Sequence, residues 1–140
     1  MTVPTSDGKR VKATVGGTTT VYIGNYLEWT GSSSTMVKYI YAGGQRVAMR
    51  VGTGATRYFL LSDHLGSTTV TANRSGAFYA ELRFKAWGEI RYSSGTTPTK
   101  FRFTGQRQED YIKLYWYGSR WYDAPLGRFC AIHRHHFTIE

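Results

Sequence analysis

The chain has 140 residues, a net charge of +9 and a composition rich in aromatic residues and glycine, with 11 Tyr, 7 Phe, 4 Trp and 16 Gly. Aromatic side chains favour strands and glycines supply the turns that many short strands require, so an all-β fold is expected. The excess of positive charge is spread evenly, at 7 − 3 = +4 over residues 1–70 and 11 − 6 = +5 over residues 71–140. Because no basic cluster stands out, nucleic-acid binding is not expected.

Three sequence features bear on the compartment of the protein. The single cysteine, Cys130, has no partner for an internal disulfide. No apolar run approaches the roughly 18 residues of a transmembrane helix, so no membrane span is expected. The first ten residues lack the apolar core of a signal peptide. The chain is therefore expected to be either cytoplasmic or an internal or C-terminal piece of a longer secreted protein.

A 22-residue repeat organises the middle of the chain. Gly44, Gly66 and Gly88 lie 22 residues apart, and each follows an aromatic or aliphatic segment and precedes alternating polar and apolar residues. This pattern predicts a unit of strand, turn and strand. A weaker copy begins at Asp7, out of register with the others. A unit of this size buries a core only against stacked neighbours, which predicts a continuous sheet and a scaffold role.

Two turns follow in the next part of the chain. Asp63–Gly66 predicts a tight turn in which Gly66 takes positive φ. Asn73–Gly76 predicts a second turn, which joins residues 69–72 to residues 78–84 as a hairpin.

The last third of the chain predicts further strands and one short helical turn. After a polar loop at residues 93–98, the alternation in Phe101–Phe103 predicts a strand. At most a short helical turn is expected, near residues 106–112, which begin Gln-Arg-Gln-Glu-Asp. Residues 111–122 are too aromatic and β-branched for a helix and predict a hairpin that turns at Gly118.

Five phrases over residues 39–129 carry a resemblance to a known family. In chain order they are Asp-His-Leu-Gly-Ser at 63–67, Trp-Gly-Glu-Ile-Arg-Tyr at 87–92, Phe-Thr-Gly-Gln-Arg at 103–107, Leu-Tyr-Trp-Tyr-Gly-Ser-Arg-Trp-Tyr-Asp at 114–123 and Leu-Gly-Arg-Phe at 126–129. Together these phrases resemble the Rhs/YD-repeat proteins, especially the core segment that ends their repeat array. The resemblance divides the chain into a divergent repeat-like segment at 1–38, YD repeats and associated core at 39–129, and a divergent tail at 130–140.

The resemblance implies stacked YD-type β-hairpins that form part of a spiralling, cage-like sheet. In such proteins the cage encloses a C-terminal toxin or effector, and the parent proteins are secreted or displayed at the cell surface. The chain is accordingly expected to be a structural shell fragment, with no catalysis and no cofactor. Its partners would be the enclosed domain or further repeats of the same parent chain, and its open sheet edges favour self-association.

The sequence departs from the family where the family's chemistry begins. Many relatives carry an aspartyl-type self-cleavage whose motif is Asp-Pro-x-Gly. Here the usual Tyr-Asp-Pro is replaced by Asp123-Ala124-Pro125, and residues 130–140 contain no Asp-Pro-x-Gly. No cleavage aspartate is therefore transferred to this chain, and the abrupt change at residue 130 is interpreted as a truncated or frame-shifted copy.

The C-terminal tail holds a cluster of metal-ligand residue types. Cys130 and His133 have one suitable spacing, but His135 and His136 do not complete a usual zinc set. They are interpreted as adventitious, so no metal site is expected.

Four acidic or histidine residues were weighed as catalytic candidates. Asp63 and His64 are neighbours, and neighbouring strand residues point to opposite faces, so a turn-forming Asp beside a packed His is favoured over an acid–base pair. Nothing fixes the separation of Asp110 and Asp123, which are expected to cap turns.

The aromatic run from Tyr111 to Tyr122 allows two interpretations. Exposed rings would suit a carbohydrate- or cell-surface-binding β module, which is the alternative function. Packing within a repeat sheet is favoured, because Tyr and Trp bury a large apolar area and keep a polar edge. The residues expected to pack are Tyr41, Trp87, Phe103, Tyr115, Trp116, Trp121, Tyr122 and Phe129. The residues expected at turns are Gly44, Gly66, Gly88, Gly105, Gly118 and Gly127.

Overall fold

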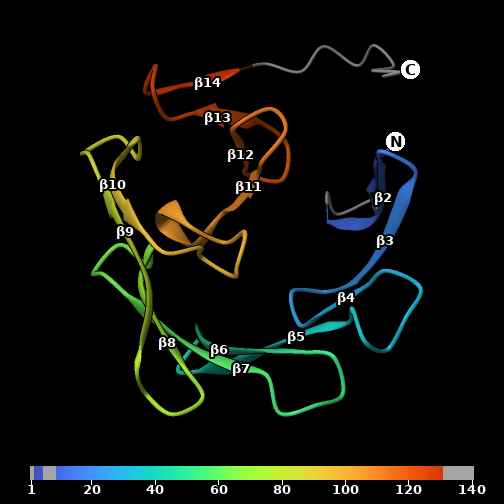
Figure 1. The fold of residues 1–140 in the computed structure, drawn as a ribbon. Coiled ribbons are helices and arrows are strands. Elements are labelled where there is room, and N and C mark those ends of the chain that lie inside the picture. The colour runs from blue at the N-terminus through green and yellow to red at the C-terminus, as the bar shows by residue number, and fades with distance from the viewer. Residues whose placement is uncertain (1, 5–8, 131–140) are drawn as a thin grey trace.

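The computed structural model describes residues 2–4 and 9–130, which fold into two antiparallel sheets (Figure 1). The first sheet has ten strands in sequence order: β1 (Thr2–Pro4), β2 (Arg10–Val15), β3 (Thr18–Ile23), β4 (Leu27–Trp29), β5 (Val37–Ala42), β6 (Gln45–Val51), β7 (Arg57–Ser62), β8 (Thr68–Asn73), β9 (Phe78–Phe84) and β10 (Ile90–Ser94). The second sheet has four: β11 (Arg107–Glu109), β12 (Leu114–Trp116), β13 (Trp121–Asp123) and β14 (Arg128–Cys130). The predicted all-β fold is confirmed.

The first sheet follows an open curve, and the chain then returns inside that curve. Figure 1 shows the strands running from β2 through β5, β6 and β7 to β10 along the curve, with β11 and β12 on its inner side. Each strand pairs with its neighbours in sequence, so the sheet is a succession of hairpins. This is the repeat sheet that the sequence predicts. Among the described residues, no helix is long and apolar enough to cross a membrane.

The predicted 22-residue period corresponds to one hairpin of the curved sheet. Gly44, Gly66 and Gly88 each lie between the two strands of a hairpin, with φ of 78°, 80° and 92°. A residue without a Cβ adopts this left-handed conformation without steric strain. Because two strands and their connections make up each period, the glycines mark successive turns at the same edge of the repeat.

Several turns share one pattern of backbone hydrogen bonds. The amide of Gly66 donates to the carbonyl of Asp63 at 3.0 Å, and Gly76 and Asn73 repeat this contact at 2.9 Å. The side-chain oxygen of Asp63 accepts from two further backbone amides at 2.9 Å, as does that of Asn73 at 3.0 Å. Gly88 donates to the carbonyl of Lys85 at 2.9 Å in the same way. The predicted turns at 63–66 and 73–76 are therefore confirmed.

Residues 101–113 depart from the sequence-based prediction. Of the strand predicted at Phe101–Phe103, Phe101 makes only an isolated bridge to Arg107, and Phe103 begins a single helical turn at Phe103–Gly105. Within residues 106–112, where at most a short helical turn was predicted, residues 107–109 form β11. The cause is tertiary: the Thr68 amide donates to the Arg102 carbonyl at 3.1 Å, and the Thr104 amide donates to the Ser67 hydroxyl at 2.9 Å. These contacts hold residues 102–104 against the start of β8 and override the local alternation.

The hairpin predicted within residues 111–122 forms over its second part. β12 pairs with β13 in the register Tyr115 with Tyr122 and Trp116 with Trp121. Residues 111–113 are a turn rather than a strand, and the Lys113 amide donates to the Glu109 carbonyl at 2.8 Å.

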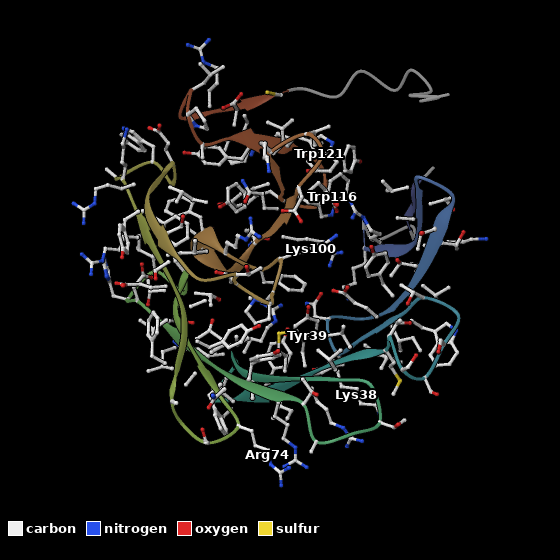
Figure 2. The ribbon with its side chains drawn as sticks, in the orientation of Figure 1. Lys38, Tyr39, Arg74, Lys100, Trp116 and Trp121 are labelled. Atoms are coloured by element: carbon white, nitrogen blue, oxygen red, sulfur yellow. The ribbon has the colours of Figure 1, made fainter. Side chains whose placement is uncertain are left out.

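Two apolar clusters hold the fold together. On the inner face of the first sheet, Tyr39, Met49 and Leu60 are buried on three adjacent strands. Alternate side chains of a strand point to opposite faces, and Figure 2 accordingly shows Tyr39 inside the curve and Lys38 outside it. The second cluster is buried around β12 and β13 and comprises Phe103, Tyr115, Tyr122 and Ala124.

Candidate functional site

A buried network of charged side chains joins the two sheets. It consists of Arg10 of β2, Glu28 of β4, and Arg107 and Glu109 of β11, and is called the charged seam below. These four side chains are between 5% and 14% exposed. Arg107 donates to Glu28 Oε1 at 2.5 Å and, through Nε, to Glu109 Oε1 at 3.1 Å. Arg10 donates to the same oxygen of Glu109.

Aromatic residues enclose the charged seam. The Tyr39 hydroxyl donates to Glu28 Oε1 at 3.2 Å, and Arg107 donates to the Tyr22 hydroxyl at 3.3 Å. The Arg10 guanidinium carbon lies 5.2 Å from the ring centre of Trp116 and 5.9 Å from that of Trp121, within the range of a cation–π contact. Figure 2 shows Trp116 and Trp121 on one side of the enclosed space and Tyr39 on the other. These aromatic side chains thus flank the seam and contribute to its burial.

A second arginine fastens the returning chain to the inner face of β5 and β6. The Arg46 guanidinium carbon lies 3.5 Å from the ring centre of Phe101, and Arg46 donates to the Tyr41 hydroxyl at 2.8 Å. The same side chain reaches the Gly105 carbonyl at 3.5 Å. The ring of Phe101 also meets that of Tyr39 edge to face at 5.1 Å. Residues 101–105 are therefore held inside the curve at a second point.

Burial and ion pairing have opposite effects on the pKa values of Arg107 and Glu109. Burial acts to lower the pKa of Arg107, but the charges of Glu28, Tyr22 and Glu109 outweigh it and raise that pKa. Burial acts to raise the pKa of Glu109, but Arg10 and Arg107 outweigh it and hold the pKa of that carboxyl below its usual range. Both shifts favour the charged forms of Arg107 and Glu109 at neutral pH.

The lowered pKa of Glu109 predicts a loss of stability in acid. A carboxyl whose folded pKa lies below its unfolded value of about 4.3 contributes stability that is complete above that pH and declines as the pH falls through the folded pKa. We expect the free energy of unfolding to fall less steeply below about pH 4 in Glu109→Gln than in the unsubstituted chain. Urea unfolding at a series of pH values measures this. Glu89→Gln, which removes a half-exposed partner of Lys85, is the control and should leave the slope unchanged.

A cavity of about 280 Å³ lies beside the seam, between β2–β4 and the second sheet. Its lining includes Tyr22, Glu28, Tyr39, Arg107 and Trp116. Glu28 accepts hydrogen bonds from Arg107 and Tyr39 at the same oxygen, Oε1, so this oxygen is engaged in holding the two sheets together. The charged seam therefore acts as a connection between the two sheets, called the ionic latch below.

Some of the residues that were expected to pack are buried in the core, and others lie partly or largely at the surface. Phe103, Tyr115 and Tyr122 are buried. Tyr41, Trp116 and Trp121 are half-buried, and Phe129 is 42% exposed.

Trp87 does not join the core, since it is 70% exposed. Its backbone carbonyl, rather than its indole, is the buried contact, and it accepts a hydrogen bond from the Tyr122 hydroxyl at 2.7 Å. Trp87 lies in a turn and contributes to the core through its main-chain carbonyl, so its aromatic side chain does not need to be buried. Its ring lies over Gly127, where an added Cβ would be 3.4 Å from Trp87 Cγ.

The remaining candidate residues lie in turns. Gly105, Gly118 and Gly127 take φ of 70°, 84° and 61°. Asp123 accepts a hydrogen bond from the Leu126 amide at 3.1 Å, and Asp110 forms an ion pair with Arg102 at 3.3 Å.

His64 is exposed rather than packed. Among residues 9–130, no three His, Cys, Asp or Glu side chains converge as metal ligands. Cys130 is half-buried, and His133, His135 and His136 lie outside the described residues.

The sequence reasoning did not identify the charged seam. The available signal was Arg107-x-Glu109, because residues two apart on a strand share a face, and opposite charges on one face can pair. That signal was masked by the helical turn predicted for the same residues. Their partners, Arg10 and Glu28, lie 97 and 79 residues from Arg107 in the sequence and carry no local indication of the contact.

Comparison with known proteins supports one family. The family model described as Teneurin YD-shell matches residues 29–137. Salivary gland surface protein 1 of Aedes aegypti is 35% identical over 75 residues, which are 51% of this chain and 2% of that protein.

Solved structures agree on the fold. The crystal structure of TcdB2-TccC3-TEV matches 91% of this chain and 7% of its own, with a TM-score of 0.69 at 17% identity. The Photorhabdus luminescens Tc holotoxin pore matches 90% and 7%, with a TM-score of 0.71 at 15% identity. The chain thus spans only a small part of the proteins that it matches. Because the family model covers most of its length, the chain belongs to the Teneurin YD-shell family.

Proposed function

We propose that this chain is a wall segment of a larger YD shell and that the shell encloses a polypeptide in its curve. The enclosed polypeptide would be a toxin or effector domain, or further repeats of the same parent chain. One observation carries the proposal: the chain returns to place β11 and β12 inside the curve, and the buried Arg107 of β11 is bound by Glu28 of the outer wall (Figure 1). The inner face of the sheet is thereby suited to holding polypeptide.

The seam also supports a structural rather than a catalytic role. Both carboxylates of the seam bind arginine, and the pKa of Glu109 is held below its usual range, opposite to the raised pKa that a general acid requires. We propose that the chain has no catalysis of its own. Assay of the purified chain for self-cleavage on incubation tests this, and release of a fragment at a unique bond contradicts it.

The sheet supports the proposed division of the chain. Strands β2, β3 and β4 continue the antiparallel order of the later hairpins, which favours reading residues 1–38 as divergent repeat ahead of the repeats and core at 39–129. We further propose that the parent protein is secreted or displayed at the cell surface, a location in keeping with a relative named as a salivary gland surface protein. Surface biotinylation of cells that express the parent gene tests the location, and labelling only after lysis contradicts it.

A cleavable form of the chain tests whether the inner face holds polypeptide. A site-specific protease sequence inserted after Thr96, in the exposed loop that follows β10, allows the folded chain to be cut between wall and returning segment. The two pieces are expected to coelute in size-exclusion chromatography, because the seam and the Arg46–Phe101 contact persist. Arg107→Met in the cut chain is expected to release the C-terminal piece, whereas Arg83→Met, which removes an exposed pair with Glu81, is not. Separation of the pieces without any substitution contradicts the proposal.

The open edges of the sheet predict self-association. Within the described chain β10 pairs only with β9, so the outer backbone groups of β10 are available to another strand. Exposed edges of this kind promote strand pairing between molecules. Analytical ultracentrifugation of residues 1–140 alone is expected to show oligomers that increase with concentration. A single monomeric species across the concentration range contradicts the interpretation of the chain as a shell fragment.

A further inference from the structure

Four basic side chains line up across neighbouring strands on the outer face of the first sheet. Lys38 of β5 lies opposite Arg50 of β6, and Arg50 lies opposite Arg57 of β7. The register ends with the pair Tyr58 and Asn73, so Arg57 lies next to this pair on β7 and Arg74 lies next to it in the turn that follows β8. Figure 2 shows Lys38 and Arg74 on the outside of the curve. These four residues are called the basic row below.

The basic row is not neutralised within the described part of the chain. No carboxylate there forms an ion pair with any of the four, and Arg50 donates instead to the Thr53 carbonyl at 2.7 Å. Side chains directly opposite each other on neighbouring strands lie close enough to interact, and like charges there are destabilising. A row that opposes folding in this way is expected to be matched by an anionic partner.

An apolar row lies beside the basic row on the same face. Ile40 pairs with Ala48, Ala48 with Phe59, Phe59 with Ala72 and Ala72 with Phe78, so the row crosses β5 to β9, with the small Ala48 buried between its larger neighbours and a register shift at Ala72. Ile40, Phe59 and Phe78 are 48%, 46% and 59% exposed. The solvent face of an antiparallel sheet is commonly polar, and a continuous exposed apolar patch marks an interaction surface.

A shallow cleft of about 480 Å³ opens at one end of the basic row. It lies where β7 begins and β8 ends, and it is lined by Arg57 and Arg74 and by the paired rings of Tyr58, which packs toward the inner face, and Tyr79, with ring centres 4.7 Å apart. Two arginines at one opening suit a phosphate group, because the planar guanidinium binds phosphate through two parallel hydrogen bonds.

We propose that this outer face docks on an anionic phospholipid membrane. The basic row binds lipid phosphates and carboxylates, the cleft between Arg57 and Arg74 receives one headgroup, and the apolar row enters the boundary between headgroups and acyl chains. A sulfated glycan or a nucleic acid would satisfy the basic row but leave the apolar row in water, which is why the membrane is favoured. The inference does not depend on what the shell encloses.

Vesicle flotation tests the proposal and separates bound protein from self-associated protein, which does not float. The 140-residue chain is expected to float with vesicles of phosphatidylcholine and phosphatidylserine and not with phosphatidylcholine alone. Each basic residue near an anionic surface strengthens binding about fivefold, so the triple variant Lys38→Gln, Arg57→Gln, Arg74→Gln should bind about 100-fold more weakly. The matched control is the triple variant Lys12→Gln, Arg91→Gln, Arg128→Gln, which removes equal charge at exposed positions elsewhere. It should keep most of the binding.

Two further measurements complete the test. Thermal unfolding of the Lys38, Arg57 and Arg74 triple variant should occur at the same temperature or higher, since it relieves repulsion between opposed charges. Phe59→Ser should weaken vesicle binding and leave heparin binding unchanged, because only the membrane receives the ring. Equal flotation with both kinds of vesicle, or equal losses in the two triple variants, would overturn the proposal. Binding to heparin or duplex DNA without flotation would also overturn it and assign the basic row to a soluble polyanion.

Discussion

Gly88→Ala is expected to lower the free energy of unfolding by about 2–5 kcal/mol, the sum of the strain of a left-handed alanine and the cost of overpacking the core. Gly88 has φ of 92°, and a Cβ added there would lie 2.3 Å from Phe103 Cδ1. Phe103 has little room to give, because its ring is buried among Phe84, Tyr115 and Tyr122. The turn between β9 and β10 therefore serves as one wall of the core.

Gly76→Ala is the matched control for Gly88→Ala. Gly76 has φ of 81°, in the same region, but an added Cβ would meet nothing within 4 Å. Its loss should be about 1–2 kcal/mol, from backbone strain alone. Urea unfolding of both variants gives the difference. Phe103→Leu should reduce the effect of Gly88→Ala in a double-mutant cycle, since it removes part of the ring that clashes. Equal losses at the two glycines would show that Phe103 moves aside without strain.

The contrast between these glycines shows what was predictable from the sequence. The 22-residue spacing of Gly44, Gly66 and Gly88 predicts turns, because a hairpin repeat places its turn at a fixed interval and positive φ favours glycine. The contact of Gly88 with Phe103 was not predictable, because it depends on how the returning chain enters the curve. Local chemistry determined the element, and tertiary packing determined what the element contacts.

The charged residues show the same contrast between what the local sequence indicates and what tertiary packing determines. Lys38, Arg50, Arg57 and Arg74 lie far apart in the sequence, so the even spread of charge argued against a basic patch. Strand register gathers them, because opposed positions on neighbouring strands become neighbours in space. The sequence shows the four charges, but without the strand register it does not show that they lie in one row. The charged seam was missed for a related reason, since Arg107 finds Glu28 only after the second sheet has docked.

Arg107→Met is expected to lower the free energy of unfolding by about 3–5 kcal/mol, because removal of one member of a buried ion pair strands the other. Glu28 would keep only the Tyr39 hydroxyl as a hydrogen-bond donor in the seam, whereas Glu109 would keep Arg10. Arg83→Met is the control. Its ion pair with Glu81 is exposed to solvent, and its loss should change the unfolding curve little.

A second substitution separates the stranded charge from the loss of packing. In Arg107→Met with Glu28→Gln, the uncompensated carboxylate is gone and the remaining amide still accepts from Tyr39, so most of the lost stability should return. Urea unfolding of the two single variants and the double variant gives the interaction energy. If Glu28→Gln restored nothing, Arg107 would act through its packing against Tyr22 and Phe101, and the seam would be an aromatic contact rather than an ionic latch. The joint between the two sheets would then not depend on the Arg107–Glu28 ion pair, whereas the acid sensitivity expected of Glu109 would remain, because Arg10 still binds that carboxylate.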